Sequence, residues 1–113
     1  MDLLSLILLI KTQRNKVMIK VETMLSILNT HFPQLDAVDS VEFDSDYEEN
    51  NGMWFKNSEC GLAPDGLPLW DYYMTFGVHK DTDGVHPVLY NMLHEFGFYS
   101  EPYDAGTLMA GRL

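Results

Sequence analysis

Five carboxylates occupy the eight positions from Glu42 to Glu49, and no basic residue follows them before Lys56. Alternating acids also open the calcium-binding loop of an EF-hand, which in addition requires glycine at its sixth position and glutamate at its twelfth. Counted from Asp44, those two positions hold Glu49 and Phe55. The sequence therefore argues against a calcium loop. Two interpretations remain, a solvated face of a strand and a partner-binding face.

A second set of candidate ligands has the spacing H-x-D-x-D-x-x-H, formed by His79, Asp81, Asp83 and His86. Imidazole and carboxylate groups both bind transition metals, so a loop with these residues could fold around an ion. The same residues are also typical of a turn followed by an acidic cap of a helix. Because established metal motifs have more distinctive spacings, we expect no metal or other cofactor and keep these four residues as the best metal candidates.

The sequence carries no signature of a catalytic site. Cys60 is the single cysteine, and no neighbouring pattern supplies the base that a thiol nucleophile needs, so we expect it to be a small buried residue. The chain contains no glycine-rich phosphate loop, no G-x-S-x-G elbow and no H-E-x-x-H motif. These observations favour a non-catalytic protein.

Acidic residues dominate all but the first part of the chain. Four of the seven basic residues lie within the segment 11–20, whereas sixteen acidic and three basic residues follow from Val21 onward, a net charge of −13. Nucleic acids and anionic membranes attract lysine and arginine and repel such a body. We therefore expect a protein partner with a basic surface, or a second copy of the chain, and neither nucleic acid nor a membrane as a direct partner.

The length of 113 residues and the hydrophobic fraction of 46% predict one globular domain. We expect residues 18–113 to form that domain. Residues 1–17, an apolar and then basic segment, are open to two interpretations: a strand or part of a helix of the domain, or a segment peripheral to it. The apolar run in this segment is shorter than the ~20 residues of a membrane-spanning helix, and it lacks the basic start of a secretory signal. Together with the single cysteine, these features favour a cytoplasmic protein.

Hydrophobic periodicity predicts two helices. Apolar residues at intervals of three and four indicate one helix over about 20–31, which ends before Pro33. A second stripe of the same period indicates a helix over about 87–96, with Pro87 at its start and Gly97 as a left-handed cap.

Alternation of apolar and polar residues predicts strands at 41–48, 53–59, 70–78, 98–103 and 107–110. In the first strand the acids face solvent, and a turn at Asn50–Gly52 pairs Asp46 with Lys56 on the returning strand. The whole pattern predicts a small single α+β domain of order α-β-β-β-α-β-β. Its antiparallel sheet consists of a three-strand meander and a C-terminal hairpin, with two main helices packed on one face.

Aromatic residues exceed what one helix-covered face of a small sheet can easily bury. Either the helices and the N-terminal segment cover them all, or some stay outside as anchors for a partner, where Trp and Tyr are enriched. The predicted partner-binding face joins the acids to two of the aromatics, and it consists of Glu42, Asp44, Asp46, Glu48, Glu49, Trp54 and Tyr73.

The sequence therefore favours a non-catalytic acidic protein-interaction module that docks on a basic partner. An array of carboxylates on a fixed scaffold can occupy a channel built for phosphates, so an inhibitor or nucleic-acid mimic of the mobile-element type is one form of this hypothesis. The alternative is a small-molecule or metal-binding protein, or a small enzyme, that uses the loop from His79 to His86.

Overall fold

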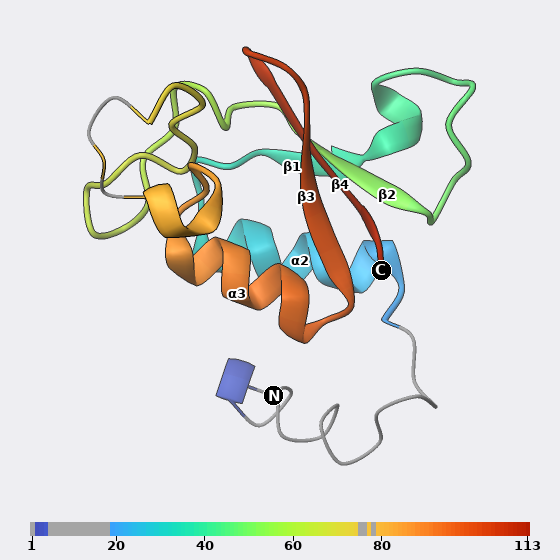
Figure 1. Cartoon of the computed structure of the whole chain (residues 1–113). Coiled ribbons are helices and arrows are strands. Elements are labelled where there is room, and N and C mark those ends of the chain that lie inside the picture. Colours follow the sequence, from blue (N-terminus) through green and yellow to red (C-terminus); the bar gives the residue numbers. More distant parts are fainter. Residues whose placement is uncertain (1, 5–18, 75–76, 78) are drawn as a thin grey trace.

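One antiparallel sheet and two helices form the part of the chain that the computed structural model describes, residues 2–4, 19–74, 77 and 79–113 (Figure 1). The sheet has the strand order β1-β2-β4-β3. Both helices lie on the same face of the sheet (Figure 1), which confirms the predicted α+β class. The elements are α2 (Val21–His31), β1 (Ala37–Asp39), β2 (Gly52–Phe55), α3 (Pro87–Glu95), β3 (Phe98–Asp104) and β4 (Thr107–Arg112).

The first helix, α2, buries the apolar stripe that its sequence predicts. Val21, Met24 and Leu28 are buried on one side of it. The helix ends where the Phe32 N–H donates to the Leu28 carbonyl at 2.7 Å, directly before Pro33. The predicted bounds are confirmed to within one residue.

The second helix, α3, is also confirmed. Pro87 occupies its first turn, and Leu89, Met92 and Leu93 form the buried stripe. Gly97 follows with a φ of 85°, the left-handed conformation that glycine adopts without strain and that ends many helices.

Alternation along β2 separates the core from the opposite face of the sheet. Met53 and Phe55 belong to the hydrophobic core under the helices, whereas Trp54 points to the other side, here called the outer face. Met109 of β4 pairs with Trp54 and is buried outside the core cluster, so it lies on the outer face as well. Burial of one Leu or Phe side chain contributes ~1.5–3 kcal/mol. The fully buried side chains of the core include Met24, Leu28, Leu35, Leu69, Leu89, Leu93, Phe98 and Leu108.

The prediction of a strand over residues 41–48 is wrong. The strand that precedes β2 and pairs with it on the side away from β4 is the short β1, in which Ala37 lies opposite Phe55 and Asp39 lies opposite Met53. After β1 the chain forms a short 3-10 helix, η1 (Ser40–Glu42). A series of turns and bends then leads to the start of β2.

The reason lies in the acids themselves. The Asp39 carboxylate and the Asp44 carboxylate each accept the backbone N–H two residues later, at 3.0 Å and 2.9 Å. Such local bonds stabilise turns in place of a strand. The predicted pair of Asp46 with Lys56 is therefore absent, and Lys56 instead lies 3.9 Å from Asp36.

The other two strands of the predicted meander are shorter than expected. The strand predicted over 53–59 ends at Phe55, and turns occupy residues 56–60. Of the strand predicted over 70–78, Trp70 forms a single bridge with Val85, and Met74 has a φ of 52°, which an extended strand does not allow. Residues 75, 76 and 78 lie outside the described part of the chain.

The C-terminal hairpin is confirmed. β3 and β4 pair along most of their length and turn at Ala105 and Gly106. Of the segment 1–17, only residues 2–4 are described, so neither interpretation of this segment is tested. Within the described residues, no helix combines the length and the apolar character needed to cross a membrane.

Candidate functional site

Residues 40–51, here called the acidic loop, leave the sheet after β1 and return to it at β2. One side chain closes the loop. Asp39 Oδ1 accepts the N–H of Val41 at 3.0 Å at the start of the loop, and Asp39 Oδ2 accepts the N–H of Asn50 at 2.9 Å near its end. A surface loop with closed ends and its own packed side chains is an Ω-loop, a type that frequently carries function.

Asn50 fastens the end of the acidic loop to α2. Its Oδ1 accepts the N–H of Val21 at 2.7 Å, in the first turn of α2, where N–H groups have no partner within the helix. Lys20, at the cap position, contributes no side-chain bond. The Asn50 carbonyl accepts the Nη2–H and Nε–H of Arg112 at 3.1 Å and 3.3 Å, while Arg112 Nη1–H donates to the Ile19 carbonyl at 2.8 Å. The acidic loop, α2 and β4 are thus joined at one point.

Phe43 packs the middle of the acidic loop onto the outer face. Its ring centroid lies 5.1 Å from that of Trp54, 4.9 Å from that of Tyr103 and 6.2 Å from that of Tyr47, each in an edge-to-face arrangement. Pairs of this kind contribute ~0.5–1.5 kcal/mol beyond the area they bury. The loop is therefore held at both ends and at its centre.

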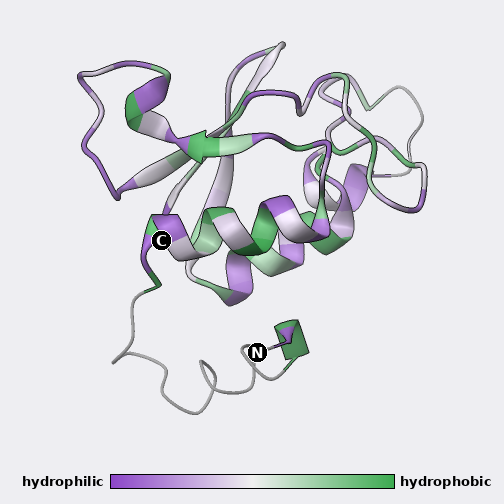
Figure 2. Ribbon diagram, turned by 180° about the vertical axis from the view of Figure 1, so that it is seen from behind, coloured by the Kyte–Doolittle hydropathy of each residue, from purple (hydrophilic) through white to green (hydrophobic). Residues whose placement is uncertain are grey.

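The acidic side chains of the loop face solvent. The loop is largely purple, the hydrophilic end of the scale, in Figure 2. Asp36 pairs with Lys56, and Asp65 accepts a hydrogen bond from His86, but within the described part of the chain no ion pair involves an acid of the loop. Arg112, which does reach the loop, binds carbonyl oxygens. The exposed and uncompensated carboxylates are those of Glu42, Asp44, Asp46, Glu48 and Glu49.

A hollow of about 380 Å³ lies on the outer face between the acidic loop and the C-terminal hairpin. It is here called the outer hollow. Tyr99, Glu101 and Tyr103 of β3 line it. Tyr99 and Glu101 are alternate residues of the regular part of the strand and face the same side, whereas Tyr103 lies at a register shift between Pro102 and Asp104. Tyr47 of the acidic loop and Met109 of β4 also line it. Three phenol rings and one carboxylate therefore meet in one concave site.

Gly111 of β4 leaves room for one of these rings. A Cβ at this position would lie 3.1 Å from the Cε1, Cζ and hydroxyl oxygen of Tyr99. The Tyr99 hydroxyl in turn donates to Glu101 Oε2 at 3.4 Å, a long and therefore weak bond. The Glu101 carboxylate keeps most of its capacity to accept stronger bonds from a ligand.

A smaller hollow of about 240 Å³ adjoins the outer hollow. The two share Tyr47 and Tyr103 as lining residues, and Phe43, Asp44 and Asp46 complete the smaller one. Carboxylates and aromatic rings therefore occur together on both sides of the shared tyrosines.

The structure divides the predicted partner-binding face. It brings Trp54 to the acidic loop through Phe43, as described above. Tyr73 packs edge-to-face on Tyr72, with ring centroids 5.0 Å apart, and is 76% exposed. It belongs to the long irregular segment 56–86, which lies at the other end of the sheet from the acidic loop (Figure 1). The five acids and Trp54 thus form one surface from which Tyr73 is separate.

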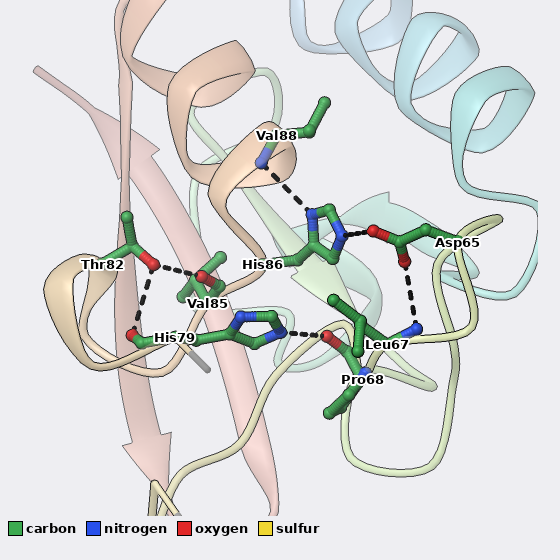
Figure 3. Close-up of polar contacts among 8 residues, drawn as sticks. All are labelled: Asp65, Leu67, Pro68, His79, Thr82, Val85, His86 and Val88. Atoms are coloured by element: carbon green, nitrogen blue, oxygen red, sulfur yellow. Dashed lines mark hydrogen bonds and ion pairs between the residues drawn. The ribbon is translucent and has the colours of Figure 1, made fainter. Parts of the chain in front are cut away.

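A second candidate site is built around His86, a buried residue that caps α3 (Figure 3). Its Nδ1 accepts the N–H of Val88 at 3.2 Å, so the ring proton lies on Nε2, which donates to Asp65 Oδ2 at 2.8 Å. The hydrogen bond from His86, together with one from the N–H of Leu67, lowers the pKa of Asp65 below its ordinary value of 3.8. Both ring nitrogens of His86 are occupied, which leaves none for a general base or a metal ligand.

His79 has a similar role in the same segment. It is 1% exposed, and its Nε2–H donates to the Pro68 carbonyl at 2.8 Å (Figure 3). Its ring centroid lies 5.2 Å from that of His86. Its Nδ1 and the indole N–H of Trp70 are buried without a partner among the residues that the structure describes. The two histidines therefore connect distant parts of the irregular segment and contribute to its stability.

The four metal candidates are not gathered around one point. Asp81 and Asp83 are exposed, whereas His79 and His86 are buried. Over the described ranges, no group of three or more His, Cys, Asp or Glu side chains could hold a metal ion. The expected acidic cap of the second helix is wrong, because His86 is the cap. Cys60 is exposed, which corrects the expectation that it is buried.

The comparisons with known proteins add no assignment. The chain matches no protein-family model, and no curated protein and no solved structure is significantly similar to it.

The site residues predicted from the sequence did not include five contributors: Tyr99, Glu101 and Tyr103, which line the outer hollow, and Asn50 and Arg112, which fasten the acidic loop. The alternation of Tyr99, Glu101 and Tyr103 in a predicted strand was a visible signal, since it places an acid between two aromatic residues on one side. The contacts of Asn50 and Arg112 had no local signal, because they join residues 62 positions apart in the sequence.

Proposed function

We propose that the chain is a non-catalytic protein-interaction module that docks a basic partner on the acidic loop and the adjoining outer face. The observation that carries this proposal is an array of exposed carboxylates, without ion-pair partners among the described residues, on a loop closed by Asp39 and fastened by Asn50. Arrays of this kind attract oppositely charged partners and accelerate their association.

The way in which the loop is held supports the same function. A partner that binds a mobile loop loses part of its binding free energy to ordering that loop. Here hydrogen bonds at both ends and the Phe43 cluster at the centre order the loop in the free protein. The carboxylates repel one another, and a basic partner surface would relieve that repulsion.

A narrower form of the proposal is an inhibitor or nucleic-acid mimic, in which the carboxylates take the place of phosphates in a partner's binding channel. This form predicts that DNA or RNA competes with the chain for the partner. The alternative function at the His79–His86 loop has less support, since the nitrogens of His86 are already occupied.

Affinity purification from cells of the native host, followed by calorimetry with the purified partner, tests the proposal. The loop variant removes four charges and keeps the side-chain shapes: Glu42→Gln, Asp46→Asn, Glu48→Gln and Glu49→Gln. The control variant removes the same number of charges at exposed positions outside the loop: Glu22→Gln, Glu59→Gln, Asp81→Asn and Asp83→Asn.

The expected partner has a basic surface, and it binds the wild type and the control variant with similar affinity. The loop variant should bind at least about tenfold more weakly, which corresponds to ~1.4 kcal/mol. Binding to the wild type should also weaken as salt is raised, because the screening length falls from ~10 Å at 0.1 M to ~3 Å at 1 M. Equal affinity of the two variants would overturn the proposal.

A further inference from the structure

We propose that the outer hollow is a binding site for an arginine side chain of the partner. This inference rests on the proposed function and names the chemical group that the surface recognises. It is carried by a cavity of about 380 Å³, by the tyrosine rings that line it and by the Glu101 carboxylate among them.

Three lining residues from β3 offer the groups that bind a planar cation, two phenol rings and one carboxylate. Tyr99, Glu101 and Tyr103 are alternate residues of one strand and all line the hollow. The Glu101 carboxylate and the phenol rings of Tyr99 and Tyr103 therefore border the same cavity, although a register shift between Pro102 and Asp104 makes the strand irregular at Tyr103. A cation placed over an aromatic ring within ~6 Å of its centroid is attracted by the electron-rich face. The hollow therefore offers a stacking surface and an ion-pair partner at the same time.

Guanidinium matches this arrangement better than ammonium does. It is planar, stacks on aromatic rings, is more weakly hydrated and presents parallel N–H donors that fit a carboxylate. The Glu101 carboxylate accepts only the long 3.4 Å bond from Tyr99. A guanidinium group can replace that bond with two shorter ones.

The surroundings also disfavour the other classes of ligand. Asp44 and Asp46 line the adjoining hollow and repel an anion. The same carboxylates would lose hydration against an uncharged apolar group without gaining a partner. The volume falls within the ~300–1,000 Å³ of small-ligand pockets, so it is large enough for one long side chain.

The hollow is formed before any ligand arrives. Gly111 allows the Tyr99 ring to lie against β4, where a Cβ would come within 3.1 Å of the ring. Tyr103 is held from the loop side by Phe43, with ring centroids 4.9 Å apart. A site whose aromatic walls are already in place loses little free energy to side-chain ordering on binding.

Titration of the isotope-labelled full chain, followed by two-dimensional amide NMR, tests the inference without any knowledge of the partner. The probes are N-acetyl-arginine amide, N-acetyl-lysine amide and N-acetyl-citrulline amide, the last of which keeps the shape of arginine and lacks its charge. The arginine probe should shift the amide signals of Tyr99, Tyr103 and Gly111 in a saturable way. The citrulline and lysine probes should bind at least several-fold more weakly.

Two substitutions and one control complete the test. Glu101→Gln should weaken binding of the arginine probe about tenfold, the loss expected when a charge-assisted hydrogen bond is removed. Tyr103→Leu should weaken it by several-fold through loss of the ring. Both side chains are exposed, so the fold should persist, and the amide spectra report whether it does. Glu22→Gln, on α2, should leave the binding unchanged.

The inference is overturned if citrulline or lysine amide binds as well as arginine amide, or if Glu101→Gln binds arginine amide as tightly as the wild type does. Its failure differs from failure of the proposed function. If the partner is captured through the acidic loop but the arginine probe does not bind in the outer hollow, only this inference fails. Arginine binding in the hollow, together with partner capture that ignores the loop charges, would remove the proposed function alone.

Discussion

Asn50 offers the sharpest test of how the acidic loop is held. Three of its groups act at once: its N–H donates to Asp39, its carbonyl accepts from Arg112, and its side-chain oxygen accepts the N–H of Val21 at 2.7 Å. The residue also has a φ of 60°. Glycine removes the side chain and still adopts the positive φ. Alanine removes the amide group and also makes the positive φ less favourable.

Asn50→Gly removes the side-chain bond to α2 and the weak 3.4 Å bond from Arg112 Nη2 to the side-chain oxygen. Loss of a capping acceptor costs ~1 kcal/mol, and glycine adopts a positive φ freely. Asn50→Ala loses the same bonds, and alanine tolerates the left-handed region less well than asparagine or glycine does, which costs up to ~1 kcal/mol more. We therefore expect the free energy of unfolding to fall by about 1 kcal/mol for glycine and by up to about 2 kcal/mol for alanine.

Asn50→Asp is the matched control. Its carboxylate can still accept the N–H of Val21, and a negative charge is favourable at the N-terminus of a helix. It also lies close to Arg112, whose Nη2 is 3.4 Å from Asn50 Oδ1. Stability should stay within ~0.5 kcal/mol of the wild type or rise slightly.

Urea unfolding of the four proteins measures these differences directly. In a domain of this size, 1 kcal/mol corresponds to ~4–8 °C in Tm, so thermal melts provide a second readout. The expected order of stability is Asp, close to the wild type, then Gly and then Ala. Alanine and glycine variants as stable as the wild type, or an aspartate variant as unstable as alanine, would refute the role given to Asn50.

Three further predictions concern the rest of the fold. Asp65→Asn should lower Tm near neutral pH. Because the folded pKa of Asp65 lies below its ordinary value of 3.8, the difference from the wild type should shrink as pH falls below that value and the carboxylate becomes protonated; a gap that persists in strong acid would contradict the contact with His86. His86→Ala should be less stable than His86→Asn by about 1 kcal/mol in urea unfolding, because an asparagine side chain can still cap α3 by accepting the Val88 N–H. Equal stabilities of the two variants would argue against that cap. Phe43→Ala should cost about 2 kcal/mol and change the fluorescence of Trp54, whereas unchanged emission would show that Phe43 does not pack there.

Elements with local causes could be predicted from the sequence. Both helices follow from apolar stripes of period 3.6, and Gly97 marks the end of α3 because few other residues adopt its conformation. The C-terminal hairpin follows from alternation on both sides of a short turn. In each case the residues that decide the structure lie within one element.

The errors have the opposite origin. The acids after β1 alternate with apolar residues as in a strand, yet the carboxylates of Asp39 and Asp44 bond to their own backbone and bend the chain. β1 itself has three residues, too few for a period to be detected. The hydrogen bond from Val21 N–H to the Asn50 side chain joins residues 29 positions apart. No local sequence pattern could therefore reveal that Asn50 fastens the loop to α2.

The change from a strand to a loop alters what the carboxylates can recognise. On a strand they would form a straight row with ~7 Å between neighbours, a regular array that could imitate the repeat of a phosphate backbone. On the acidic loop they follow turns and a short 3-10 helix, and two of them, Asp44 and Asp46, line a hollow together with aromatic rings. An irregular array with aromatic hollows matches individual basic side chains better than it imitates a polymer. Within the proposed function, the geometry therefore favours recognition of arginine-bearing protein surfaces over mimicry of a nucleic-acid strand.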